Sequence, residues 1–116
     1  MQTAKSITKS IRVPPRKARL AADLIRGLSV QAATEQLLAC QLKSGRLLEK
    51  TLRSAVANAE TQLKLKREEL VVHEVRVDAG PVLKRAKSKS KGGRAPVMKR
   101  TSHFTVVVAT TLIDLD

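Results

Sequence analysis

The stretch LVVHEVRVDAGPVLKRAKSKSKGGRAPVMKRTSHFTVVVAT, residues 70–110, decides the fold. Its two ends, 70–78 and 101–110, are rich in β-branched residues, which is typical of strands. Alternation along the second of these strands predicts a core face made of Phe104, Val106 and Val108. In the first strand, alternation predicts one face with Val71, His73, Val75 and Val77 and a second face with Val72, Glu74, Arg76 and Asp78.

Between these strands lies a basic segment, residues 80–100, with Gly92 and Gly93 near its centre. A diglycine is a signal for a two-residue hairpin turn. If both strands continue, each leg has about ten residues and is about 30 Å long at about 3.3 Å per residue. A two-stranded ribbon alone is marginal in water, so we expect an arm that projects from the domain and is ordered by a partner. A flexible basic loop is the alternative, but a diglycine midway between two strands favours the ribbon.

Before residue 70, the sequence predicts a strand over 3–13, with Ile7, Ile11 and Val13 on one face, ended by two prolines. Three helices are then predicted, over 16–26, 30–39 and 43–61. Gly27 is expected to end the first helix and Ser29 to cap the second. The expected apolar stripes are Leu20, Ala21, Leu24 and Ile25, then Val30, Ala33, Leu37 and Leu38, then Leu47, Leu48, Thr51, Leu52, Ala55, Val56 and Ala59.

The length of 116 residues suits one domain. We expect that domain to cover residues 1–110, including an arm over about 80–100. Residues 111–116 are expected to be a frayed tail.

The charge of the chain is high and unevenly distributed. Lys and Arg outnumber Asp and Glu by 23 to 10, and the net charge of +13 predicts a polyanionic partner, with nucleic acid favoured. Residues 1–22 contain six cations and no acid, and residues 79–113 contain eight cations and no acid. These candidate contacts to the polyanion are Lys5, Lys9, Arg12, Arg16, Lys17, Arg19, Lys84, Arg85, Lys87, Lys89, Lys91, Arg94, Lys99 and Arg100.

Two groups of cations lie on predicted helices. Arg16, Lys17 and Arg19 crowd the first turn of the helix over 16–26, where they oppose the helix dipole, and a bound phosphate would compensate for this. A second group lines one face of the helix over 43–61, and that face is either solvated or in contact with RNA. Its members are Lys43, Arg46, Lys50 and Arg53.

The composition argues against several other functions. Phe104 is the single aromatic residue, so the chain lacks the aromatic platform on which bases are usually stacked, and phosphate contacts should dominate. The arm contains glycine and proline instead of bulky apolar residues, which argues against a membrane surface. His73 and His103 have no cysteine or carboxylate at a ligand spacing, so we expect no metal, no cofactor and no catalytic residue.

The expected location is the cytoplasm, with a plastid or other organelle less favoured. Cys40 is the single cysteine and cannot form an internal disulfide, which favours a reducing compartment. No apolar run approaches the roughly 18 residues of a membrane span. The first residues also lack the apolar block of a signal peptide.

Four segments together resemble the family of bacterial large-subunit ribosomal protein twenty-two. They are PRKARLAADLIRG (15–27), SAVANAE (54–60), VRVDAGPVLKR (75–85) and GRAPVMKRTSHFTVVV (93–108). The resemblance covers nearly the whole chain, and the segments occur in the family's order. It implies an α+β fold of order β-α-α-α-β-β, with a three-stranded antiparallel sheet, helices packed on one face and a long protruding β-hairpin.

The resemblance also implies a function. Such proteins are structural constituents of the large ribosomal subunit that bind its rRNA and support assembly. Their hairpin lines the exit tunnel of the nascent polypeptide, opposite ribosomal protein four and among other neighbouring ribosomal proteins. The tunnel-facing tip would be Lys91, Gly92, Gly93 and Arg94, one glycine wider than is usual in the family.

A free-standing basic nucleic-acid-binding protein is the alternative function, and an enzyme is a distant third. Tight binding to duplex DNA, with no preference for large-subunit rRNA, would favour the alternative.

Overall fold

The computed structural model describes residues 2–88 and 94–110, with the backbone alone for 85–88 and 94–97. Along the chain, the elements are β1 (Thr3–Ile11), α1 (Pro15–Ile25), α2 (Val30–Ala39), α3 (Lys43–Gln62), the short 3-10 helix η1 (Arg67–Glu69), β2 (Leu70–Ala79), β3 (Leu83–Ser88), β4 (Arg94–Lys99) and β5 (Ser102–Thr110). The predicted α+β class and the order β-α-α-α-β-β are confirmed, with β3 and β4 forming the hairpin inserted between the last two strands of the body.

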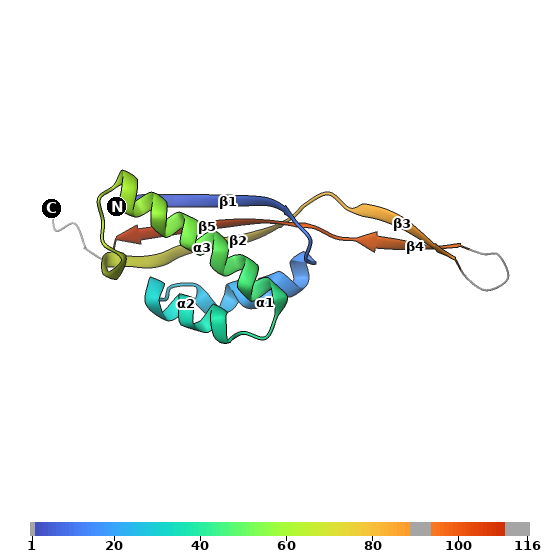
Figure 1. The fold of residues 1–116 in the computed structure, drawn as a ribbon, viewed down its shortest axis with the longest axis horizontal. Helices are drawn as coiled ribbons and strands as arrows, with labels where there is room; N and C mark the ends of the chain where they lie inside the picture. Colours follow the sequence, from blue (N-terminus) through green and yellow to red (C-terminus); the bar gives the residue numbers. More distant parts are fainter. Residues whose placement is uncertain (1, 89–93, 111–116) are drawn as a thin grey trace.

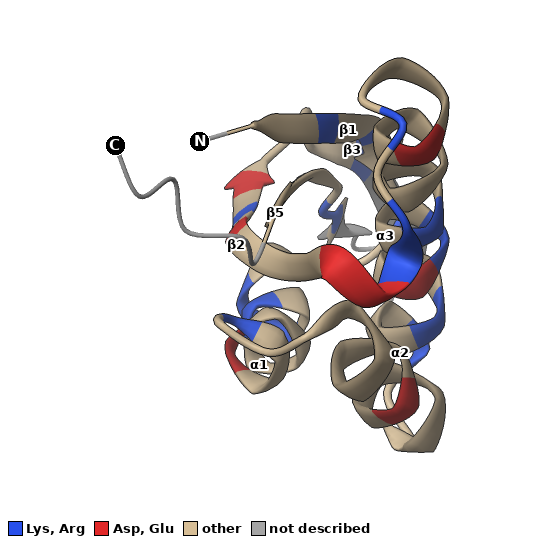
Figure 2. Cartoon of the chain, turned by 90° about the vertical axis from the view of Figure 1, so that its left-hand side faces the viewer, with Lys and Arg blue, Asp and Glu red and all other residues tan. Residues whose placement is uncertain are grey.

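The body of the protein is a three-stranded antiparallel sheet with the order β1-β5-β2. The last strand in the sequence is therefore the central one. The helices lie on one side of the sheet, with α3 against β1 and β5 and α1 against β2 (Figure 1, Figure 2). The predicted core face of β5 is confirmed, because Phe104, Val106 and Val108 are fully buried beneath the helices.

Two β-bulges explain where the simple alternation fails. In β2, the register shifts between Val72 and Glu74, so Val72 faces the same side as Val75, and His73 is exposed. In β1, the buried residues near the start are Ala4 and Ser6, while Ile7 is 47% exposed. The predicted faces are therefore confirmed for Val75, Val77 and Val13 but wrong for His73 and Ile7, because an extra residue at a bulge reverses the parity between its two sides.

The β1 bulge lies between Thr8 and Ile11 and contains Ser10, whose φ is +56°. After this bulge the chain turns inward, so that Ile11 is partly buried and Val13 is buried.

The predicted stripes of the first two helices are confirmed only in part, with Ala21 and Ile25 of α1 and Val30, Ala33 and Leu37 of α2 buried as expected. In α1, Leu20 and Leu24 are exposed, and Ala18 and Ala22 are buried in their place. Alanine has no side chain beyond Cβ, so this face lets α1 approach β2 closely. In α2, Leu38 alone departs from the predicted stripe, with 62% of its surface exposed. The stripe of α3 is confirmed, with Leu47 only partly buried.

Both predicted helix boundaries between α1 and α2 are confirmed. Gly27 follows α1 with a φ of +80°, a conformation that residues with a Cβ rarely adopt. The Ser29 hydroxyl accepts a hydrogen bond from the amide of Ala32 at 3.3 Å, which caps α2.

The arm is a ribbon with its own hydrogen-bonding ladder. β3 and β4 pair antiparallel from Leu83 opposite Lys99 to Ser88 opposite Arg94. They form a separate two-stranded sheet that projects beyond the body, and the molecule extends over 70 × 24 × 21 Å (Figure 1). The ribbon favoured by the sequence is present, but β2 and β5 do not run into it without a break, because the chain leaves strand geometry over 80–82 and 100–101. Lys89, Lys91, Gly92, Gly93 and the predicted tail 111–116 lie outside the described residues.

Removing the arm is expected to leave the body folded. Replacing Ala86–Val97 with two glycines takes away most of the β3–β4 sheet, and the core residues found among the described side chains all lie outside this segment. The melting temperature should therefore fall by no more than a few degrees, and unfolding should stay cooperative, as measured by circular dichroism. Non-cooperative melting of this variant would show that the arm is part of the core.

Candidate nucleic-acid interface

The N-terminal cations are all exposed but lie on different surfaces. Lys5 and Lys9 are on β1, Arg12 is in the connection to α1, and Arg16 and Lys17 are in the first turn of α1. Pro14 precedes this helix and provides no side-chain cap, and the first turn contains no acid. The first amide groups of a helix attract anions, so this end of α1 is suited to a phosphate.

Arg19 has a structural contact that the sequence did not predict. Its Nε donates a hydrogen bond to the carbonyl of Val77 at 3.2 Å, and Arg26 donates to the carbonyl of Val75 at 2.9 Å. β2 is an edge strand, and these two arginines, one within α1 and one just after its last residue, satisfy carbonyls on its outer side. Arg19 therefore helps to close the sheet edge, and its remaining donors are left for an external acceptor.

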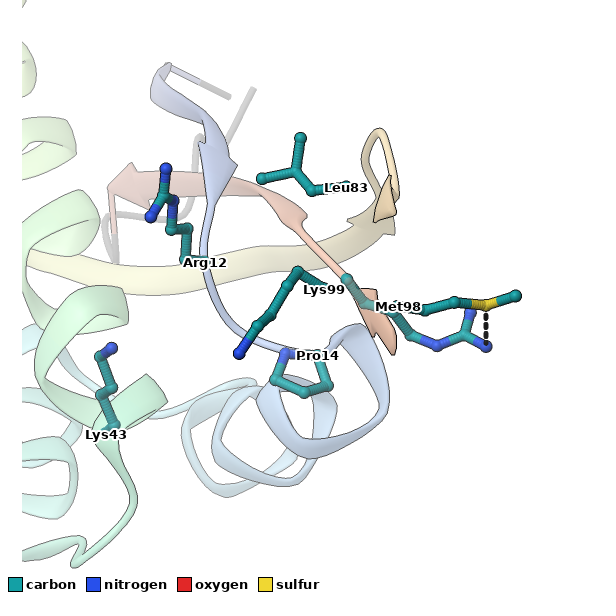
Figure 3. Close-up of a pocket in the computed structure, with 7 residues that line it drawn as sticks. Arg12, Pro14, Lys43, Leu83, Met98 and Lys99 are labelled. Carbon is teal, nitrogen blue, oxygen red and sulfur yellow. Dashed lines mark hydrogen bonds between the residues drawn. The ribbon is translucent and has the colours of Figure 1, made fainter. Parts of the chain in front are cut away.

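The clearest gathering of cations lies where the arm leaves the body. A hollow of about 440 Å³, here called the root hollow, is lined by the cations Arg12, Lys43, Lys99 and Arg100 (Figure 3). These cations come from three separate parts of the chain: the β1–α1 connection, the start of α3 and the end of β4. No acid lines the hollow, and none of the four forms an ion pair with a residue that the structure describes. Here the electrostatic potential favours a polyanion.

A smaller hollow of about 190 Å³ continues from the root hollow toward the helices. It shares Arg12 and Lys43 and adds Lys17 and Ser44. α3 begins here with no side-chain cap, and its first turn contains no acid. Ser44 is buried, and its hydroxyl has no hydrogen-bond partner among the described residues. The positive end of the α3 dipole thus adds to the charge of the four root cations.

The four cations of α3, whose role the sequence left open, have different surroundings in the structure. Lys43 joins the root hollow, while Arg46 and Lys50 are simply exposed. Arg53 binds both carboxylate oxygens of Glu49, at 3.0 and 2.7 Å, and so neutralises an acid that is largely buried. The sequence left Lys43 open between a solvated face and contact with RNA, and the one local signal for its place in the hollow is its position at the start of a helix without an acidic first turn.

The arm carries the remaining candidate cations. Lys84 is exposed near the base of β3, and the backbone places Arg85 and Lys87 further along the same strand and Arg94 at the start of β4. Of the predicted tip, Lys91, Gly92 and Gly93 are outside the described residues, and only the backbone of Arg94 is described. Lys84 pairs with Met98 across the ladder, so the cationic and apolar residues of the arm alternate near its base.

The junction between arm and body is tightly packed. The amide of Gly80 donates to the carbonyl of Thr101 at 2.9 Å, and the Thr101 hydroxyl donates to the carbonyl of Pro81 at 2.6 Å. A Cβ on Gly80 would lie 2.5 Å from the Thr101 hydroxyl oxygen and 3.0 Å from Cε1 of His103. His103 itself accepts a hydrogen bond at Nδ1 from the amide of Ser10. The junction therefore requires a glycine.

Replacing Gly80 with alanine is expected to destabilise the protein by about 1–3 kcal/mol, because the added methyl group has no room. Thermal unfolding would measure this as a lower melting temperature. Adding Thr101→Ala removes the nearest clashing atom, so the double variant should lose less stability than the two single variants together. A Gly80→Ala variant as stable as the natural chain would show that the junction adapts freely.

Metal binding and membrane spanning have no support in the part of the chain that the structure describes. No group of three or more His, Cys, Asp and Glu residues gathers in a way that could hold a metal ion within this part of the chain. His73 is exposed on β2. Among the described helices, none is both long enough and apolar enough to cross a membrane.

Comparison with known proteins adds the family. The model of the family "Ribosomal protein L22p/L17e" matches residues 6–109, which include all three helices and the arm. The chain belongs to this ribosomal protein family. It is 70% identical over 109 residues to the large ribosomal subunit protein uL22 of Protochlamydia amoebophila, covering 94% of the chain and 98% of that relative. The uL22 proteins of Chlamydia pneumoniae and Chlamydia abortus are 66% and 65% identical over 104 residues, covering 90% of the chain and 94% of each relative. The expected membership of this family is confirmed.

Proposed function

We propose that this ribosomal protein binds large-subunit rRNA mainly through phosphates, using the cations of its acid-free N-terminal and arm segments. As a member of the L22p/L17e family, it is a structural constituent of the large ribosomal subunit, in a family of ribosomal proteins and not of enzymes. Its relatives are bacterial ribosomal proteins, in keeping with a cytoplasmic ribosome.

The observation that carries the proposal is the root hollow. It brings together cations from segments that are far apart in the sequence, with no acid in its lining. Like charges repel one another, so this arrangement costs stability unless an anion occupies it. A folded RNA brings several backbone phosphates close together, and these phosphates would supply the negative charge that the cations require. By bridging RNA segments in this way, the protein would support assembly of the subunit.

The arm suggests the second part of the proposal. β3 and β4 form a sheet of their own outside the core, and such a ribbon is marginal in water unless a partner orders it. We propose that rRNA surrounds the arm and that its tip, Lys91, Gly92, Gly93 and Arg94, lines the exit tunnel. There it would face the nascent polypeptide and ribosomal protein four.

Two measurements test rRNA binding. A tagged copy of the chain should sediment with the large subunit in a sucrose gradient. The purified protein should bind large-subunit rRNA with an affinity that falls steeply with salt. If it contacts about six to eight phosphates, the logarithmic slope is about −4 to −7. Recovery at the top of the gradient, with equal affinity for duplex DNA, would instead support a free-standing nucleic-acid-binding protein.

A further inference from the structure

The root hollow has an apolar side that phosphate binding does not require. Pro14, Leu83 and Met98 line it together with the four cations (Figure 3). Met98 is 54% exposed, although a methionine side chain is mostly apolar. The volume of about 440 Å³ lies within the range of small-molecule sites, about 300–1,000 Å³.

The two apolar residues of the arm do not form one surface, because Leu83 lies opposite Lys99 and Met98 lies opposite Lys84, which puts their side chains on opposite faces of the ribbon. Met98 extends toward Arg100 and forms an apolar wall beside it (Figure 3). This wall, next to the other cations of the hollow, fits a ligand that has a flat apolar part and an anionic part.

We propose that the root hollow receives a single unstacked rRNA nucleotide. Its base would lie against Met98 and the guanidinium of Arg100, while its own and the adjoining phosphates face Arg12, Lys43 and Lys99. This inference rests on the proposed rRNA binding and goes further, because it adds contact with one base to an interface in which the composition predicts that phosphate contacts dominate. In this hollow, a methionine and an arginine would contact the base in place of the exposed aromatic residues that usually stack on it.

The contact between Arg100 and Met98 supports a base-binding role. Nη2 of Arg100 lies 4.0 Å from Sδ of Met98, which holds the planar guanidinium beside the apolar wall. Guanidinium planes stack on unpaired RNA bases, and the polarisable sulfur of methionine makes favourable contacts with aromatic rings. Arg100 can therefore contribute stacking as well as charge. Figure 3 shows Lys99 reaching across the hollow toward Pro14, where it can contact a phosphate beside the base.

The wall also argues for an unpaired nucleotide over a duplex. A duplex keeps its bases stacked inside and presents only sugars and phosphates along its backbone, so the wall would have no apolar partner. Extruding a base costs energy, and the cost is least where the base is already unpaired. The expected target is therefore a loop or bulge of the large-subunit rRNA.

The test changes the wall without changing the charge. The probe is full-length large-subunit rRNA from Protochlamydia amoebophila, whose uL22 is 70% identical to this chain. Met98→Ala should weaken binding about tenfold with an unchanged salt slope. Val82→Ala is the matched control, because Val82 is exposed at the same end of the arm but does not line the hollow. It should bind like the natural chain.

Chemical probing of the base edges supplies a second readout. The natural chain should protect one unpaired nucleotide, and Met98→Ala should expose it again while the other protections remain. If the natural chain binds but Met98→Ala binds and protects as well as Val82→Ala, the base-binding inference is wrong and the proposed function stands. If the natural chain shows no affinity for the rRNA at low salt, both are overturned.

Discussion

Replacing Phe104 with alanine is expected to bring the protein close to global unfolding. Phe104 is fully buried in the central strand β5, opposite Thr8 of β1 and Val77 of β2, and it is the only aromatic residue in the chain. Removing such a side chain leaves a cavity as well as removing apolar contacts, at a cost of about 3–5 kcal/mol. Domains of this size are stable by only about 5–15 kcal/mol, so most of that stability would be lost.

Urea unfolding followed by circular dichroism would measure the change. The matched control is Leu38→Ala, which also replaces a large apolar side chain with alanine, but at a position that is 62% exposed. It should alter the free energy of unfolding by no more than about 0.5 kcal/mol. Similar losses at Phe104 and Leu38 would contradict the structure, because the sequence pattern alone predicts both residues to be in the core.

This contrast shows what the sequence could predict about the fold. The run of β-branched residues around Phe104 identifies a buried strand, because a central strand buried on most of its length needs no precise alternation. β1 and β2 are edge strands, where only one face is buried and a bulge changes which face that is. No local signal marks the extra residue in β2 at Val72–Glu74, since the bulge is fixed by pairing with β5.

The same limit applies to the helices. The 3.6-residue period locates α1 and α2 but does not fix where the buried stripe of each helix ends. A leucine is usually buried in preference to an alanine, yet α1 buries Ala18 and Ala22 and exposes Leu20 and Leu24. The choice depends on how closely the helix must approach β2, where Arg19 and Arg26 bind strand carbonyls. That distance is a property of the assembled fold.

The sequence predicted most of the residues that form the candidate site but not how the fold brings them together. The two acid-free segments are visible in the sequence and supply Arg12, Lys99 and Arg100. Their meeting with Lys43 depends on where α3 begins relative to the base of the arm, which only the folded chain shows. The apolar wall was missed for a related reason. A single apolar residue in a basic arm gives no signal in the sequence. Only the folded chain shows that Met98 lies beside Arg100.

Neutralising the root hollow should have the largest effect on RNA binding. Arg12→Gln, Lys43→Gln and Lys99→Gln together remove three cations but keep Arg100 beside Met98. Each phosphate contact contributes about 0.7–0.9 to the salt slope, so the slope should become less steep by about two to three. At about 0.1 M salt, the same relation predicts a loss of about 10²- to 10³-fold in affinity. All three side chains are exposed, so the fold should be unaffected.

A control with the same charge separates this local effect from the overall charge. Lys64→Gln, Lys66→Gln and Arg67→Gln also lower the net charge of +13 by three, but they lie between α3 and β2, at the end of the body opposite the arm (Figure 1). Long-range attraction between exposed charges is screened beyond about 10 Å at 0.1 M salt, so these changes should weaken binding only slightly. Equal losses from the two triple variants would mean that the protein binds RNA through its overall charge and that the convergence of cations at the base of the arm has no special role.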